Sequence, residues 1–158
     1  MSAPWSPKNT LKQDLKKGLK AENLRQRDFE KVFGILVKTG TYDNFDWVNE
    51  KGDIYVEHKE RSIDFGRYGD LFFDRIKYDK YLELKEENPF VRAFIIWTCN
   101  GESYVWEFCD QFDEDDNASF YFSRKTMDRR RGHGFMPQEL VNVWNEEITK
   151  LGEFVFKR

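Results

Sequence analysis

The sequence has few residues of the kinds that build zinc sites and disulfide frameworks. It contains two cysteines, Cys99 and Cys109, and two histidines, and none of them has a zinc-type spacing. Two isolated cysteines predict buried thiols rather than a cross-linked scaffold. A glycine-rich phosphate loop, a dinucleotide-binding fingerprint and a Gly-x-Ser-x-Gly turn are also missing from the sequence. The motifs of several large enzyme classes are therefore absent.

Long apolar runs are missing as well. No stretch of about 18 apolar residues occurs, so we expect no membrane span. The first 13 residues lack the apolar core of a signal peptide, so we expect no secretion and a cytoplasmic location, which for a viral protein is the host-cell cytoplasm. Aromatic residues make up 17% of the chain, enough to build a core although 35% of the residues are charged.

Basic charge gathers at the start of the chain. Residues 1–27 have a balance of +5, so the rest of the chain, whose total is −3, has a balance of −8. Leu11, Leu15 and Leu19 recur at helical spacing beside a stripe of lysines. This pattern suits either a docking helix with a solvated basic side or an arm that contacts phosphates. We predict a basic N-terminal arm over residues 1–20 and a single domain over residues 21–158.

The pattern of apolar residues and turn signals predicts alternating helices and strands. The expected helices are residues 21–38, 70–87 and 138–151, and the expected strands are residues 41–48, 53–60, 91–98, 102–109 and 119–123. Asn100-Gly101 is the strongest hairpin signal in the chain. The order predicts an α/β protein with a mixed central sheet flanked by helices.

One hairpin carries a candidate catalytic site. The first strand contains Asp46, and the second places Glu57 and Lys59 two residues apart, so that both side chains leave the same face of the strand. Two carboxylates can hold a hard divalent cation, and an ammonium beside them can act on the attacking water of a phosphodiester hydrolysis. The alternative interpretation is a solvated strand end. Asp43 is the second choice for the partner carboxylate of Glu57.

An aspartate on one strand followed by Glu-x-Lys on the next resembles the PD-(D/E)XK, or restriction-endonuclease-like, nuclease superfamily. The order of motifs is most similar to compact phage or large-virus nucleases of this superfamily, with Holliday-junction resolvases and recombination exonucleases nearby. The superfamily core consists of a helix, three strands, a helix and a strand, which would cover residues 21–108. Residues 61–69 are the candidate for the third strand.

The resemblance also implies roles for individual residues. Asp46 and Glu57 would bind Mg²⁺ or Mn²⁺, and Lys59 would orient or deprotonate the attacking water. Some members add a carboxylate from the first helix, for which Glu30 is the candidate here, with a plain surface residue as the alternative. Some direct a basic residue of the second helix toward the phosphate, for which we choose Lys80, with Lys77 almost as good.

A basic loop is the second feature with chemistry in it. Arg129, Arg130, Arg131 and His133 combine positive charge with two neighbouring glycines, which lets the backbone approach phosphates closely. The loop is either a phosphate-binding element or a solvated turn that the acidic run at residues 113–116 partly neutralises. The chain has no histidine spacing that would make His133 a zinc ligand.

Taken together, the resemblance implies a metal-dependent nuclease that hydrolyses DNA, either branched or linear duplex. Resolvases of this type pair two sites by symmetry, so a homodimer is one alternative for the assembly. The competing hypothesis is a catalytically inactive module of the same fold that serves as a nucleic-acid-binding, virion structural or host-factor-interaction protein.

Overall fold

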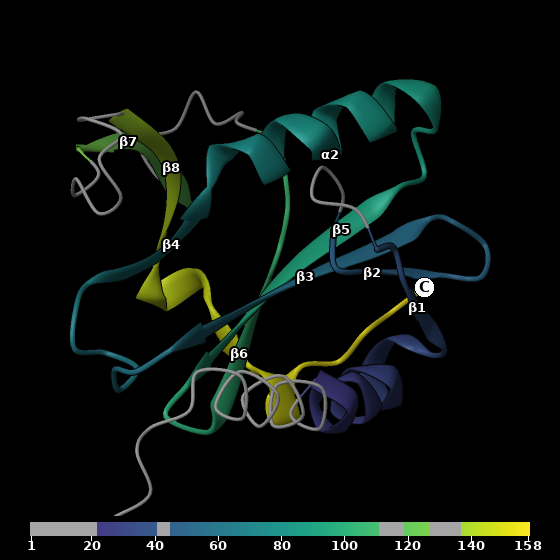
Figure 1. Ribbon diagram of the computed structural model, residues 1–158, viewed down its shortest axis with the longest axis horizontal. Coiled ribbons are helices and arrows are strands. Elements are labelled where there is room, and N and C mark those ends of the chain that lie inside the picture. Colours follow the sequence, from purple (N-terminus) through teal and green to yellow (C-terminus); the bar gives the residue numbers. More distant parts are fainter. Residues whose placement is uncertain (1–21, 41–44, 111–118, 127–136) are drawn as a thin grey trace, which may run out of the picture.

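The computed structural model describes residues 22–40, 45–110, 119–126 and 137–158 of the chain. Two sheets organise this part: a six-stranded sheet in the order β1-β2-β3-β5-β6-β9 and a three-stranded sheet in the order β4-β8-β7 (Figure 1). The strands are β1 (Leu36–Lys38), β2 (Trp47–Asn49), β3 (Ile54–Arg61), β4 (Asp70–Asp74), β5 (Arg92–Cys99), β6 (Glu102–Glu107), β7 (Phe120–Thr126), β8 (Pro137–Trp144) and β9 (Thr149–Lys150). The helical segments are residues 22–33, α2 (Arg75–Glu87) and two 3-10 turns, η1 (Asn145–Glu147) and η2 (Leu151–Glu153).

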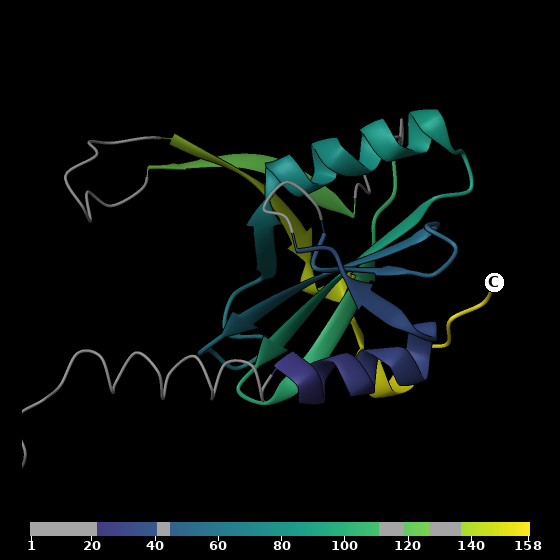
Figure 2. The same ribbon diagram turned by 45° about the vertical axis from the view of Figure 1, so that its right-hand side comes forward.

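Helices cover both faces of the six-stranded sheet. The helix over residues 22–33 lies on one face and α2 lies on the other, as the two views show (Figures 1 and 2). Strand β3 pairs with β5 in parallel, whereas the other neighbours in this sheet are antiparallel. The prediction of an α/β protein with a mixed sheet flanked by helices is therefore confirmed.

Each face of the sheet has its own hydrophobic core, because alternate residues of a strand point to opposite sides. On the face of the 22–33 helix, Phe29 and Phe33 pack with Phe94 of β5. On the other face, the core includes Tyr78 of α2 and Trp97 of β5, together with the inner side of the three-stranded sheet. Strand β5 lies between the two cores and is almost completely buried.

Two hairpins form where the sequence predicts them. Trp47 of β2 pairs with Val56 of β3 in antiparallel register. At the turn between β5 and β6, Asn100 and Gly101 both have positive φ angles, of 47° and 90°. This is the conformation in which an Asn-Gly turn follows the natural twist of a hairpin.

The first predicted helix is too long. It ends at residue 33 rather than residue 38, and Leu36–Lys38 forms β1, which pairs with β2. The stop is Gly34, with φ +84°, and its amide donates to the Glu30 carbonyl. The left-handed conformation favours glycine and ends the helix early. Strand β1 thus supplies a third strand beside β2 and β3, whereas residues 62–69, most of the range predicted for that strand, form none.

Two further helix predictions are wrong at least in part. Residues 70–74, the predicted start of a helix, form β4, and the helix begins at Arg75. The predicted helix over residues 138–151 is instead β8, followed by short 3-10 turns and β9. Strand β8 pairs with β4 on one side and β7 on the other. Hydrogen bonding to two distant strands outweighs the local helical spacing of its apolar residues.

The two cysteines differ in their surroundings. Cys99 of β5 is buried, as predicted, but Cys109 is exposed, and its Sγ lies 3.6 Å from the Ser119 hydroxyl. None of the helices in the described ranges is both long and apolar enough to cross a membrane. The predicted N-terminal arm, residues 1–20, lies outside the described residues.

Candidate active site

The β2–β3 hairpin brings the two predicted carboxylates together. Asp46 directly precedes β2, and its backbone amide donates a hydrogen bond of 3.2 Å to Oε1 of Glu57. In turn, the backbone amide of His58 donates to Oδ2 of Asp46 at 2.8 Å. The register of the hairpin therefore fixes Asp46 opposite Glu57, and main-chain amides of the hairpin, those of Asp46 and His58, hold the two carboxylates in place.

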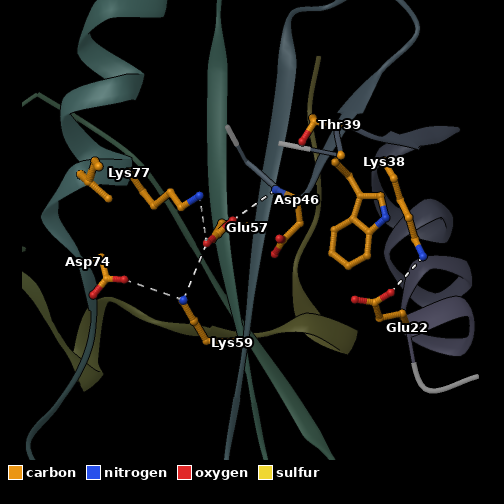
Figure 3. A pocket seen from close by; sticks show the side chains of 11 residues that line it. Glu22, Lys38, Thr39, Asp46, Glu57, Lys59, Asp74 and Lys77 are labelled. Atoms are coloured by element: carbon orange, nitrogen blue, oxygen red, sulfur yellow. Dashed lines mark hydrogen bonds and ion pairs between the residues drawn. The ribbon is translucent and has the colours of Figure 1, made fainter. Parts of the chain in front are cut away.

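Two ammonium groups face Glu57 from different elements. The Nζ atom of Lys59, on the same face of β3, lies 3.9 Å from Oε2 of Glu57 and 4.0 Å from Oδ2 of Asp74. The Nζ atom of Lys77, from the first turn of α2, lies 3.6 Å from the same Glu57 oxygen. Figure 3 shows both lysines pointing to Glu57 from the side opposite Asp46. The predicted Glu57–Lys59 pair is therefore assembled, with Lys77 as a second cation.

These groups line a cleft with a volume of about 530 Å³. Its walls come from the 22–33 helix, the end of β1, the β2–β3 hairpin and the start of α2. The lining residues are Glu22, Lys38, Thr39, Gly40, Asp46, Trp47, Glu57, Lys59, Asp74, Ile76 and Lys77. On the wall opposite α2, Lys38 pairs with Glu22 at 2.9 Å (Figure 3). The cleft is thus a charged site, lined by four acidic and three basic side chains.

Glu57 is the most perturbed acid of the site. It is only 2% exposed, and its pKa rises from 4.5 to about 7. Burial is the main cause, followed by the negative charge of Asp46; Lys77 and Lys59 act in the opposite direction but do not cancel the rise. Near neutral pH Glu57 therefore stands at the point of losing its proton. A cation placed beside its carboxylate would favour the ionised form.

His58 takes no part in the cleft. Its side chain points to the other face of the sheet, as the alternation of β3 predicts, and lies against the ring of Phe29. Its Nε2 atom shares a hydrogen bond of 2.8 Å with the hydroxyl of Thr98, and burial lowers the pKa of His58. We therefore assign His58 a packing role.

Two of the predicted site residues lie elsewhere. The carboxylate of Glu30 accepts the backbone amide of Leu36 at 2.9 Å, and so stabilises the turn between the helix and β1. The Nζ atom of Lys80 lies 3.8 Å from Glu83 on the surface of α2. Neither residue is among the described residues that line the cleft. The same two helices contribute Glu22 and Lys77 to the cleft instead.

Several predicted residues cannot be placed. Asp43, the second choice for the partner carboxylate, and the basic residues Arg129, Arg130, Arg131 and His133 lie outside the described residues, as does the acidic run at residues 113–116. The assembly described above rests on residues from the described ranges only.

The donor set of the cleft fits a hard divalent cation. Within the described ranges no group of three or more Asp, Glu, His or Cys side chains gathers as a metal site. Asp46 and Glu57 do supply two neighbouring carboxylates. The Glu57 carboxylate accepts a hydrogen bond from the Asp46 amide, and the two side chains are also hydrogen-bonded to one another. Mg²⁺ commonly binds one or two protein carboxylates and takes its other ligands from water and substrate phosphates. The pKa of Glu57 is raised mainly by burial and then by the charge of Asp46, and a cation bound there would stabilise the ionised carboxylate.

Comparisons with known proteins add no relative. No protein-family model matches the chain, and no curated protein and no solved structure is significantly similar to it.

Proposed function

We propose that this protein is a metal-dependent nuclease that hydrolyses phosphodiester bonds in DNA. The observation that carries the proposal is the meeting of Asp46, Glu57 and Lys59 in one cleft, with Glu57 buried and its pKa raised to about 7. Carboxyl groups with a shifted pKa in a cleft are typical of catalytic sites. Burying such a group destabilises the fold, so it is found mainly where catalysis or binding needs it.

The order of elements supports the same proposal. A helix, the strands β1, β2 and β3, then α2 and β5 follow one another, with β4 inserted before α2. This order resembles the helix, three strands, helix and strand of the PD-(D/E)XK superfamily. The parallel pairing of β3 with β5 places α2 over the face of β3 that carries Glu57 and Lys59. A restriction-endonuclease-like core is therefore part of the proposal.

The side chains of the cleft suggest separate roles in metal binding and in hydrolysis. Asp46 and Glu57 would hold Mg²⁺ or Mn²⁺, which when bound would act as a Lewis acid toward water and the phosphate. The Lys59 side chain is 28% exposed, so it can reach the attacking water and the charge that develops on the phosphate oxygens. Lys77 is buried beside Glu57, and it would fix the orientation of that carboxylate. A water oxygen would form the new bond to phosphorus while the bond to the leaving oxygen breaks, and the proton released by the water would pass through solvent to the leaving oxygen.

Replacing Lys59 tests the proposal directly. We expect the wild-type protein to cut linear, nicked or four-way-junction DNA with Mg²⁺ or Mn²⁺ but not with EDTA, and Lys59→Ala to lose roughly 100-fold or more of the rate. Gel electrophoresis of labelled DNA measures the rate, and thermal unfolding checks that the variant is folded. Lys31→Ala is the matched control, because the Lys31 side chain is 78% exposed and lies on the 22–33 helix away from the cleft. A wild-type protein that cuts none of these substrates would support the inactive-module hypothesis instead.

Metal binding should depend on pH through Glu57. The pKa of about 7 means that a proton competes with the cation below neutral pH. We expect Mn²⁺ to bind roughly tenfold more weakly at about pH 6 than at about pH 8, as measured by calorimetry. Asp46→Asn should lose most of this affinity, whereas Glu30→Gln should keep it, since Glu30 lies outside the cleft. Equal Mn²⁺ affinity at both pH values would contradict a role for Glu57 as ligand.

A further inference from the structure

The outer face of the three-stranded sheet carries aromatic and basic side chains. Because side chains alternate along a strand, Leu71, Phe73, Val141 and Val143 point into the core. The residues between them point outward. We call the set Arg61, Phe72, Tyr121, Lys125 and Trp144 the aromatic-basic face. Its first member comes from β3 and the others come from β4, β7 and β8.

The aromatic rings of this face are partly open to solvent and ordered by their neighbours. The rings of Tyr121 and Trp144 lie 4.8 Å apart at an angle of 35°, and Trp144 is 40% exposed. The hydroxyl of Tyr121 donates to Asp70 at 2.6 Å, and Asn142 donates to the same carboxylate at 3.5 Å. The carboxylate of Asp70 is therefore engaged by two neighbouring donors, and Tyr121 is held in one orientation.

Cations flank the third ring. The Arg61 guanidinium lies 5.0 Å from the centre of the Phe72 ring, and the Lys125 ammonium lies 5.5 Å from it. Phe72, Asn142 and Tyr121 occupy one row across β4, β8 and β7, because Phe72 and Tyr121 both pair with Asn142. The face thus combines flat rings with positive charge, the two elements with which proteins bind unpaired bases and the phosphates that join them.

This face is continuous with the cleft. Arg61 lies two residues beyond Lys59 on the same face of β3. Asp74, at the end of β4, lies 4.0 Å from the Lys59 ammonium and accepts a hydrogen bond from Gln138 of β8. A chain of phosphates that passes Lys59 would therefore meet Arg61 and then Phe72. Strand β4 is an edge strand of the smaller sheet and leads directly into α2 (Figure 1).

We propose that the aromatic-basic face binds a single-stranded segment of nucleic acid next to the scissile position in the cleft, with its bases stacked on Trp144 and Tyr121 and its phosphates bound by Arg61 and Lys125, which Phe72 holds in place. The part of this statement that concerns cleavage rests on the proposed nuclease function. In an intact duplex the flat faces of the bases are already stacked on one another, so the rings of the face have nothing to stack on. The preferred substrate would therefore carry an unpaired strand, such as an overhang, a flap or a single strand.

The test is binding of a dye-labelled short oligothymidylate in EDTA, followed by fluorescence anisotropy. Stacking contributes on the order of a tenfold change in affinity per base, so Trp144→Ala should bind roughly tenfold more weakly than wild type. Trp144→Phe keeps a flat ring and should recover most of the affinity. Phe90→Ala is the matched control, since Phe90 is an aromatic residue 82% exposed at the turn between α2 and β5. Thermal unfolding confirms that each variant is folded.

Two results would overturn the proposal. One is a wild-type protein that does not bind the oligothymidylate; the other is a Trp144→Ala protein that binds it as tightly as Phe90→Ala does. The Lys59→Ala variant separates this proposal from the nuclease. If neither it nor the wild type cuts DNA but both bind the oligothymidylate through Trp144, the face is supported and the nuclease function fails. If the wild type cuts DNA but Trp144→Ala changes neither binding nor the preference for unpaired substrates, the face fails and the nuclease function stands.

Discussion

Glu57→Gln is expected to make the protein more stable at alkaline pH and to abolish the proposed nuclease activity. In the folded protein the pKa of Glu57 is about 7 rather than 4.5. Between these two values the folded state holds a proton that the unfolded state has lost, so the free energy of unfolding falls as the pH rises. Each pKa unit is about 1.36 kcal/mol, so the loss amounts to about 3 kcal/mol once the pH exceeds 7. Glutamine resembles the protonated acid and escapes this loss.

Urea unfolding at about pH 5 and about pH 9 measures the effect. The gain from Glu57→Gln should be small at the lower pH, where wild-type Glu57 is mostly protonated, and about 3 kcal/mol at the higher one. Cleavage should fall roughly 1,000-fold, because a neutral amide cannot compensate a divalent cation as a carboxylate does. Glu83→Gln is the matched control: its side chain is 71% exposed, and Glu83-Leu84-Lys85 has the same spacing as the site motif. If Glu57→Gln raised the free energy of unfolding equally at the two pH values, the raised pKa of Glu57 would be contradicted.

The site hairpin could be predicted from the sequence because its signals are local. Alternating apolar residues, a turn with Gly52 and the spacing of Glu57 and Lys59 all lie within 20 residues. The structure brings Asp46 within hydrogen-bonding distance of Glu57, as the strand pattern indicates. A two-residue period decides both the pairing and the face from which each side chain leaves.

The rest of the cleft depends on how distant elements pack. Glu22 and Asp74 enter it only because the 22–33 helix and β4 come to lie beside the hairpin. Glu30 and Lys80 lie on the two helices from which site residues were expected. The rotation of each helix, however, points their side chains away from the cleft. The rotation of a helix about its axis is set by which of its residues fill the core. The apolar pattern of one sequence does not predict that rotation to within a single residue.

Two of the three strands of the smaller sheet, β4 and β8, were missed for a related reason, whereas β7 overlaps the strand predicted over residues 119–123. Leu140, Val141, Trp144 and Ile148 have the spacing of one helix face, but in the structure they lie in β8 and in the turn that follows it. What decides the outcome is the pairing of β8 with β4, about 70 residues earlier in the chain, and with β7. Pairing between distant strands has no signal in a short stretch of sequence. The aromatic-basic face, which depends on this pairing, could therefore not be predicted from the sequence.

Trp97→Ala is the second change from which we expect a large effect, because Trp97 connects the two sheets. Its side chain is fully buried in β5, and its indole N–H donates to the carbonyl of Phe72 in β4 at 2.9 Å. It is also the register partner of Lys59 in the parallel pairing of β3 with β5. Truncating a buried tryptophan to alanine costs about 3–5 kcal/mol, through lost contacts and the cavity that remains. We expect the same loss here in urea unfolding.

Phe94→Ala separates damage to the fold from damage to the site. Phe94 is also fully buried in β5, but it points to the opposite face, toward Phe33 of the 22–33 helix. Its truncation should cost a similar 3–5 kcal/mol. At low temperature, where both variants remain folded, Trp97→Ala should slow cleavage, since it loosens β4 and the strand position beside Lys59. Phe94→Ala should cut at nearly the wild-type rate. If the two variants lost activity equally, overall stability would explain the loss, and the smaller sheet would have no specific part in holding the site.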